Sequence, residues 1–102
     1  MSKPTSVVPS ATGPVQVRLR LYVSGDAPNS VRAVANAKAI CAAHFDSRYD
    51  LEIIDLVAEP LRALADGIIV TPTLIRLLPL PVQRVVGNLS DTSQVLVALA
   101  GA

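Results

Sequence analysis

The chain has 102 residues and a formal net charge of +1 at pH 7, with an apolar content of 51% and an aromatic content of 3%. This length suits a single domain, whose core must be filled mainly by aliphatic side chains and alanine. The near-zero charge and the few aromatic side chains disfavour nucleic-acid binding and attraction to an anionic membrane.

The first fourteen residues have the composition of a tail. Residues 1–14 hold three of the eight prolines, with Ser, Thr and Gly between them. Such a segment buries little apolar surface, so we expect a flexible tail before a single domain over 15–102. No apolar run of roughly 7–15 residues follows Lys3, and no stretch approaches the roughly 20 apolar residues of a spanning helix. The chain is therefore expected to be cytoplasmic.

The first half of the domain predicts a strand, a helix and a second strand. Apolar and polar residues alternate over 15–23, as in a half-buried strand. An apolar stripe over 29–45 predicts a helix, with Asn29 or Ser30 as its N-cap. The nearly continuous apolar run over 50–57 is typical of a strand that is covered on both faces.

The second half predicts a short helix, two paired strands and a last helix. The short helix covers 59–65 and ends before a glycine, which suits a left-handed C-cap. Two apolar runs, 73–78 and 82–87, are joined by a proline-rich turn and are expected to pair antiparallel. Asp91 or Ser90 can cap a final helix that runs into the terminal alanines.

The predicted order, β-α-β-α-β-β-α, is that of a thioredoxin-like α/β fold. A right-handed parallel crossover comes first and an antiparallel hairpin comes last, which together give a mixed sheet. The sequence Thr71-Pro72-Thr73 stands where thioredoxin-like proteins place a cis proline. Its spacing alone leaves a cis Pro72 and an ordinary trans proline at an edge strand equally open.

Redox, metal and acid–base chemistry find no support in the residues. A thioredoxin-type redox site needs a reactive thiol at the start of the first helix. The segment 25–30 has no cysteine, and Cys41 lies deep in the predicted helix, where an inert buried thiol is expected. One cysteine and one histidine exclude a Cys-x-x-Cys pair and a cysteine-based zinc site. Because the carboxylates are also scattered, we expect neither catalysis nor a cofactor.

Charge is distributed unevenly over the predicted core elements. Five of these positions are basic: Arg18, Arg20, Arg32, Arg76 and Arg84. The acidic residues gather around the second strand instead: Asp46, Asp50, Glu52 and Asp55. Most surface charges are simply solvated, but an asymmetry of this kind also suits electrostatic docking of a protein partner.

Long stretches resemble the KaiB family. The run LYVSGDAPNSVRA over 21–33 resembles the opening of KaiB, usually written LYVAGNTPNSVRA. The resemblance continues through three further stretches: Ile54-Asp55-Leu56 with Glu59-Pro60, Val70-Thr71-Pro72-Thr73-Leu74, and LPLPVQRVVGNLS over 78–90. It covers about 17–99 without gaps.

The resemblance implies a non-enzymatic clock regulator. KaiB-like proteins bind the first ring of the hexameric ATPase KaiC, and in cyanobacteria the complex sequesters KaiA and engages output histidine kinases. A second interpretation is a thioredoxin-like sensor domain similar to that of a clock histidine kinase. The residues expected to contact or shape a KaiC-like docking site are Arg18, Arg20, Tyr22, Asn29, Arg32, Glu52, Arg76 and Arg84.

The family resemblance also implies two alternative folds, a tetramer with a rearranged second half and a thioredoxin-like monomer that binds KaiC. Family members often read Gly-Leu-Asp where this chain has Ala98-Leu99-Ala100. Alanine is favoured over glycine in a helix by about 0.8–1 kcal/mol, so we expect mainly the monomeric form. Family members also often carry lysine at Glu52 and a second arginine at Gln83, so a weaker docking surface or a divergent KaiC is expected.

Overall fold

The computed structural model describes residues 6–8 and 15–100. Its elements are β1 (Ser6–Val8), β2 (Val17–Val23), α1 (Pro28–His44), β3 (Tyr49–Asp55), α2 (Pro60–Ala65), β4 (Thr73–Leu78), β5 (Gln83–Val86) and α3 (Thr92–Ala100). From β2 onward the order is the predicted β-α-β-α-β-β-α, so the thioredoxin-like α/β prediction is confirmed. Helix α3 is regular through Ala98 to Ala100, as the alanine content predicts.

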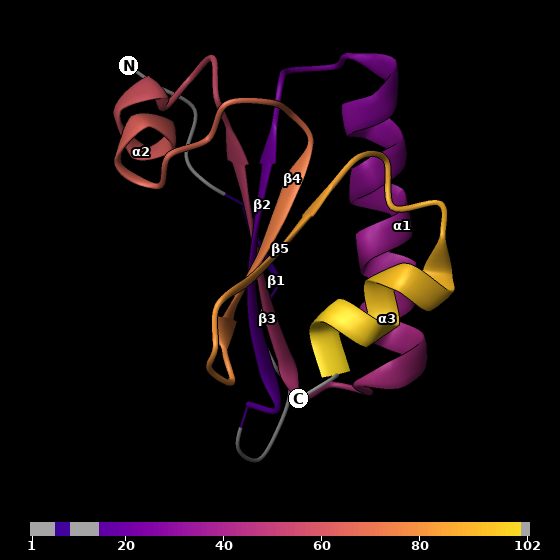
Figure 1. Cartoon of the computed structure of the whole chain (residues 1–102). Helices are drawn as coiled ribbons and strands as arrows, with labels where there is room; N and C mark the ends of the chain where they lie inside the picture. The colour runs from indigo at the N-terminus through magenta and orange to yellow at the C-terminus, as the bar shows by residue number, and fades with distance from the viewer. Residues whose placement is uncertain (1–5, 9–14, 101–102) are drawn as a thin grey trace.

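The strands form one mixed sheet in the order β1-β3-β2-β4-β5. Strands β2 and β3 are parallel, and every other neighbouring pair is antiparallel. Helices α1 and α3 cover one face of the sheet, and α2 lies on the other face (Figure 1). Because side chains alternate along a strand, this layering sends successive residues of β2 toward different helices.

The main core lies between the sheet and the pair α1 and α3. Its fully buried members on β2, β3 and β4 are Val17, Leu19, Leu21, Leu51 and Leu74. On the opposite face, Tyr22, Ile54 and Ile75 pack with Ala63 of α2 in a second, smaller cluster. The half-buried strand predicted over 15–23 is therefore covered on both faces near its end, since Tyr22 is also fully buried.

Strand β1 falls within the segment that composition predicts to be a tail. It pairs antiparallel with β3, with Ser6 opposite Ile53 and Val8 opposite Leu51. Composition carries no signal for this strand, because a short edge strand is held by backbone groups that only the assembled sheet presents. The rest of the predicted tail, 1–5 and 9–14, lies outside the described residues.

Helix α1 begins two to three residues earlier in the sequence than its predicted caps imply. Pro28 is its first residue and Ala27 its N-cap, without a side-chain capping bond. Proline suits this position because its φ is already helical and its missing N–H would have no helical partner. Ser30 is buried, and its Oγ accepts a hydrogen bond from the Ser24 N–H at 2.9 Å. The prediction that Asn29 or Ser30 caps the helix is therefore wrong.

The proline-containing segments around β4 adopt cis peptide bonds. The Thr71–Pro72 bond, for which spacing left cis and trans open, is cis, and so are the Leu78–Pro79 and Leu80–Pro81 bonds. Just after the first of these, the Thr73 hydroxyl donates to the Val70 carbonyl at 2.7 Å. Pro72 thus lies at the entry of β4, between the segment that follows α2 and the sheet.

Candidate partner-docking site

The arginines of β2 face carboxylates of β3. Because these parallel strands are in register, Arg18 lies beside Asp50, and Arg20 lies beside Glu52. The Arg18 Nη2 atom is 3.2 Å from Asp50 Oδ2, and Arg20 Nε donates to Glu52 Oε1 at 3.1 Å. Two of the basic residues therefore pair with two of the acidic residues across these neighbouring strands.

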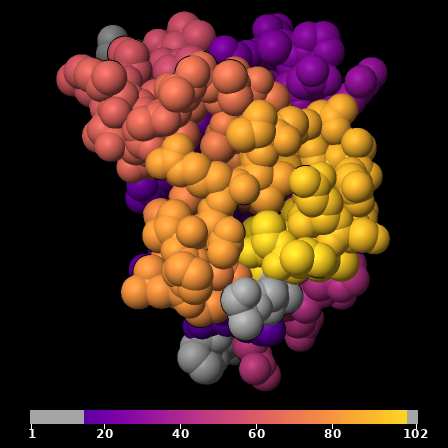
Figure 2. Space-filling model, in the orientation of Figure 1, coloured from indigo at the N-terminus to yellow at the C-terminus, as the bar shows by residue number. Residues whose placement is uncertain are grey.

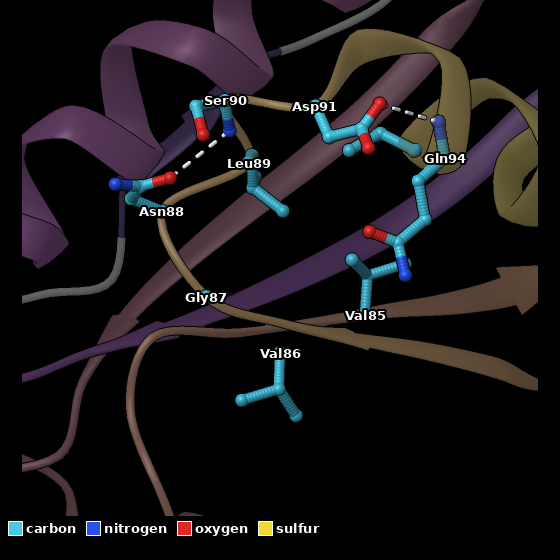
Figure 3. Close-up of a pocket in the computed structure, with 9 residues that line it drawn as sticks. Val85, Val86, Gly87, Asn88, Leu89, Ser90, Asp91 and Gln94 are labelled. Carbon is cyan, nitrogen blue, oxygen red and sulfur yellow. Dashed lines mark hydrogen bonds between the residues drawn. The ribbon is translucent and has the colours of Figure 1, made fainter.

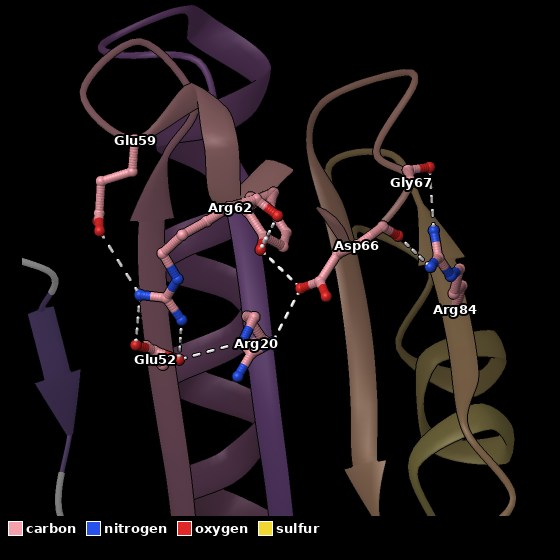
Figure 4. Close-up of polar contacts among 8 residues, drawn as sticks. Arg20, Glu52, Glu59, Arg62, Asp66, Gly67 and Arg84 are labelled. Carbon is pink, nitrogen blue, oxygen red and sulfur yellow. Dashed lines mark hydrogen bonds and ion pairs between the residues drawn. The ribbon is translucent and has the colours of Figure 1, made fainter. Parts of the chain in front are cut away.

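Residues of α2 extend this pairing into a network (Figure 4). Arg62 donates two hydrogen bonds to Glu52, at 2.8 and 2.9 Å, and its Nη1 lies 3.6 Å from a Glu59 oxygen. Arg20 Nη1 donates to Asp66 Oδ2 at 2.8 Å. We call Arg20, Glu52, Glu59, Arg62 and Asp66 the α2 network, since together they tie α2 and its following residue to the sheet.

Tyr22 contacts the α2 network from the sheet, between β2 and α2. Its side chain is fully buried, and its hydroxyl lies 2.6 Å from Asp66 Oδ2 and 3.0 Å from the Arg62 carbonyl oxygen. Burial and the neighbouring Asp66 carboxylate raise the pKa of Tyr22 to about 12. The phenol therefore stays protonated and acts as a hydrogen-bond donor under α2.

The two carboxylates at the centre of the network have lowered pKa values. Hydrogen bonds from Arg62, followed by those from Arg20, lower the pKa of Glu52 despite its partial burial. Burial acts to raise the pKa of Asp66, but the hydrogen bonds from Tyr22 and Arg20 outweigh it and lower the pKa. Both groups are thus held in the charged form by the folded structure.

These shifts predict a loss of stability in acid. A carboxyl with a lowered folded pKa stabilises the protein above its unfolded pKa, and this contribution is lost as the pH falls through the folded value. The ordinary values are 4.5 for Glu52 and 3.8 for Asp66. We therefore expect the urea midpoint to be nearly constant from neutral pH down to about pH 5 and to fall below about pH 4.5.

A matched pair of variants checks this assignment. Glu52→Gln removes one titrating carboxylate from the network, so its urea midpoint should be lower at neutral pH and should fall less between neutral and acid pH. Asp26→Asn replaces an exposed carboxylate outside the network and should keep the wild-type pH profile. Identical profiles for the wild type and Glu52→Gln would show that the network does not carry the acid sensitivity.

The structure places two of the predicted contact residues in the interior. Tyr22 lies under α2, and Arg76 is only 1% exposed. The Arg76 guanidinium donates to the Leu99 carbonyl at 3.3 Å and to the Pro81 carbonyl at 2.7 Å. The first side chain lies under α2, and the second lies under the end of α3, so both support the fold from the interior.

The other predicted contacts lie nearer the surface, but not together. Arg20 and Glu52 are 24% and 26% exposed and are engaged in the α2 network. Arg18 is half-exposed at its pair with Asp50. Asn29 and Arg32 are exposed at the start of α1. Arg84 is exposed on β5, and its guanidinium donates to the Asp66 and Gly67 carbonyls (Figure 4).

An exposed apolar surface lies on α2 and the segment after it. We call Leu61, Leu64, Ile69 and Val70 the α2 patch; they are 79%, 76%, 94% and 47% exposed. Helix α2 is so short that only Ala63 is buried, and its other apolar side chains remain in solvent. Figure 2 shows this part of the chain, in salmon, at one corner of the molecule. The patch was not predicted from the sequence, although its signal was present: a six-residue helix carries more apolar residues than it can bury.

A shallow apolar hollow adjoins the patch. It is lined by Gly67, Ile69, Val70, Thr73, Arg84 and Val86. The residues come from the α2–β4 connection and from the two last strands, so the hollow exists only in the assembled fold. Arg84 supplies a positive charge at its rim. An apolar surface with a charged rim is the arrangement found in protein–protein interfaces.

A second hollow lies between β5 and the start of α3 (Figure 3). Here the Ser90 N–H donates to Asn88 Oδ1 at 3.0 Å, and the Gln94 N–H donates to Asp91 Oδ1 at 3.1 Å. The second bond makes Asp91 the N-cap of α3, one of the two predicted caps. These polar groups are thus engaged in the turn and the cap.

The described residues show no further chemical site. Among them, no group of three or more His, Cys, Asp and Glu side chains is placed to hold a metal ion. Cys41 is fully buried, and burial raises its pKa to about 12, so its thiol stays protonated. None of the described helices is long and apolar enough to cross a membrane.

Comparisons with known proteins point to clock components. A family model described as the KaiB domain matches residues 20–100. The circadian clock oscillator protein KaiB of Synechococcus elongatus is 48% identical over 81 residues, which cover 79% of each chain. The circadian clock protein KaiB3 of Synechocystis is 44% identical over 84 residues, 82% of each chain. The matched region contains the α2 network and the α2 patch.

One solved structure is similar throughout the fold. The solution structure of the N-terminal domain of Synechococcus elongatus SasA aligns with a TM-score of 0.67 and 27% sequence identity. The alignment covers 87% of this chain and 87% of that domain. The likeness therefore extends over most of both chains.

Proposed function

The chain belongs to the KaiB family of circadian clock proteins, and we propose that it acts by docking a KaiC-like hexameric ATPase and not by catalysis. The α2 patch is the observation that carries this proposal. Leu61, Leu64 and Ile69 are each more than three-quarters exposed, at 79%, 76% and 94%. Exposed apolar clusters with polar surroundings mark interaction sites on soluble proteins. The patch therefore supports a protein partner.

The α2 network supports the proposal by ordering the patch in advance. A six-residue helix has few hydrogen bonds of its own and needs tertiary contacts to persist. Arg20 reaches Asp66 at the end of α2, and Glu52 receives two bonds from Arg62 within it. A surface that is already ordered loses less conformational entropy on binding. The network thus favours docking without contacting the partner.

This arrangement changes the role proposed for Glu52. From the sequence alone, a glutamate at this position, in place of the family's lysine, is expected to weaken docking. In the structure Glu52 is bound by Arg20 and Arg62, so its charge is compensated within the chain. We propose that Glu52 positions α2, while Arg84 lies at the rim of the site. Arg18, Asn29 and Arg32 are proposed as peripheral contacts.

Further partners and states follow from the same proposal. We propose that the KaiC-bound chain recruits KaiA or output histidine kinases, and that the free chain is a cytoplasmic monomer with the homotetramer as its alternative state. A second candidate function is a sensor-like domain of clock signalling, favoured by the likeness to the SasA N-terminal domain. A KaiC-like gene beside this one, with no histidine kinase, would favour the first function.

Co-elution with KaiC homologues tests the proposal. Hexamers loaded with ATP or with ADP are mixed with the chain and separated by size-exclusion chromatography. We expect the chain to co-elute with at least one homologue and to prefer one nucleotide state. Failure to bind every homologue in both states would contradict the docking function.

A further inference from the structure

The two edges of the sheet are protected in different ways. An edge strand presents unpaired N–H and C=O groups that another chain can use as a template. Strand β5 is only four residues long, comes after Pro79 and Pro81, and is followed by Gly87, all of which limit strand addition. At the other edge of the described sheet, β3 would be outermost if β1 were not paired with it.

Strand β3 has no comparable protection of its own. It is seven residues long and contains no proline, glycine or lysine. Its carboxylates Asp50 and Glu52 are paired with arginines of the same chain, so their charges are largely compensated. An edge strand that lacks proline and lysine, and whose charges are compensated within its own chain, lacks devices that usually block pairing between molecules. The cover that β3 does have is β1, paired across its middle from Leu51 to Ile53.

We propose that β1 is a guard strand, which prevents the β3 edge of one molecule from pairing with the β3 edge of a second copy. This inference is independent of the α2 patch. An antiparallel β3–β3 pair around a two-fold axis at Ile53 places Ile53 opposite Ile53 and Glu52 opposite Ile54. No carboxylate then lies opposite another, whereas an axis at Glu52 would oppose two glutamates. The edge is therefore self-complementary in the register centred on Ile53.

Strand β1 protects the β3 edge because it is tethered close to it in the same chain. Only three residues of β1 pair with β3, so the strand itself is weakly held and can open locally. Its short connection to β2 keeps it near the edge at an effective concentration in the millimolar range, above most protein concentrations. A second molecule therefore competes poorly while β1 can pair, and it gains access when β1 cannot.

Two prolines placed in β1 of the full-length chain test this proposal. Successive N–H groups of a strand point to opposite sides, so in Val7→Pro/Val8→Pro one of the two lost N–H groups must face β3. The control, Ala11→Pro/Thr12→Pro, places two prolines outside β1. Light scattering from micromolar to millimolar concentration should show that the mass of the β1 variant doubles, while the wild type and control do not change with concentration.

A third substitution tests the proposed register. Adding Ile53→Lys to the β1 variant places two charges opposite each other at the dimer axis, and it should restore the wild-type mass. Protection of the β2 amides from hydrogen exchange confirms that each variant is folded. In Val7→Pro/Val8→Pro, the β3 amides should also gain protection as the protein concentration rises. Three results would overturn the proposal: equal masses in all variants, the same rise in the Ala11→Pro/Thr12→Pro control, or a rise that appears without concentration-dependent protection in β3.

Discussion

Arg76→Ala is expected to lower the free energy of unfolding by about 3 kcal/mol or more. The side chain is 1% exposed and donates to carbonyls at Leu99, near the end of α3, and at Pro81, in the turn between β4 and β5. Truncation leaves a cavity and removes donors from these carbonyls. The two losses add because one side chain fills the space and makes both bonds.

Two further variants, measured by urea unfolding at neutral pH, separate the contribution of the buried volume of Arg76 from that of its hydrogen bonds. Arg76→Met keeps most of the buried volume but no donor, so its cost should be smaller than that of Arg76→Ala. Arg32→Ala truncates an exposed arginine and should change the free energy of unfolding by no more than about 0.5 kcal/mol. A cost for Arg76→Ala no larger than for Arg32→Ala would show that the buried guanidinium does not stabilise the fold.

The double variant Leu64→Asp/Ile69→Asp is expected to weaken docking to a KaiC-like hexamer by about two orders of magnitude. In the wild type, the proposed interface buries the apolar side chains of Leu64 and Ile69. In the variant it would have to bury two carboxylates, which carries a large desolvation cost. Because these side chains are 76% and 94% exposed, the free energy of unfolding should change little. Titration of labelled chain with the hexamer, followed by fluorescence anisotropy, measures the dissociation constant.

A matched control keeps this experiment specific to the α2 patch. Val31→Asp/Val97→Asp also replaces two exposed apolar residues, which are 54% and 73% exposed and lie on α1 and α3. This control should bind as the wild type does. Wild-type affinity in the patch variant would remove the α2 patch from the site, and equal loss in both variants would place the main contact elsewhere.

Local sequence determined the elements and their order. Some patterns involve only residues a few positions apart, so they can be recognised from the sequence without the tertiary structure. They are the alternation over β2, the apolar stripe of α1 and the turn residues between them. The same holds for Asp91, which caps α3 by bonding the Gln94 N–H three residues away. Gly67 has a φ of +66°, as a left-handed residue after α2 requires. These features, with the KaiB resemblance, were sufficient to predict the elements from β2 to α3 and their order.

Tertiary structure alone decided which charges pair and which apolar residues stay exposed. Arg20 and Asp66 are 46 positions apart, and they meet because α2 folds back over β2. Periodicity identifies two faces of a strand but not what covers each. Tyr22 and Arg76 were therefore expected to contact or shape a docking site, although both are buried. The exposure of the α2 patch and the pairing of β1 were also decided at this level, since burial and strand pairing both depend on distant parts of the chain.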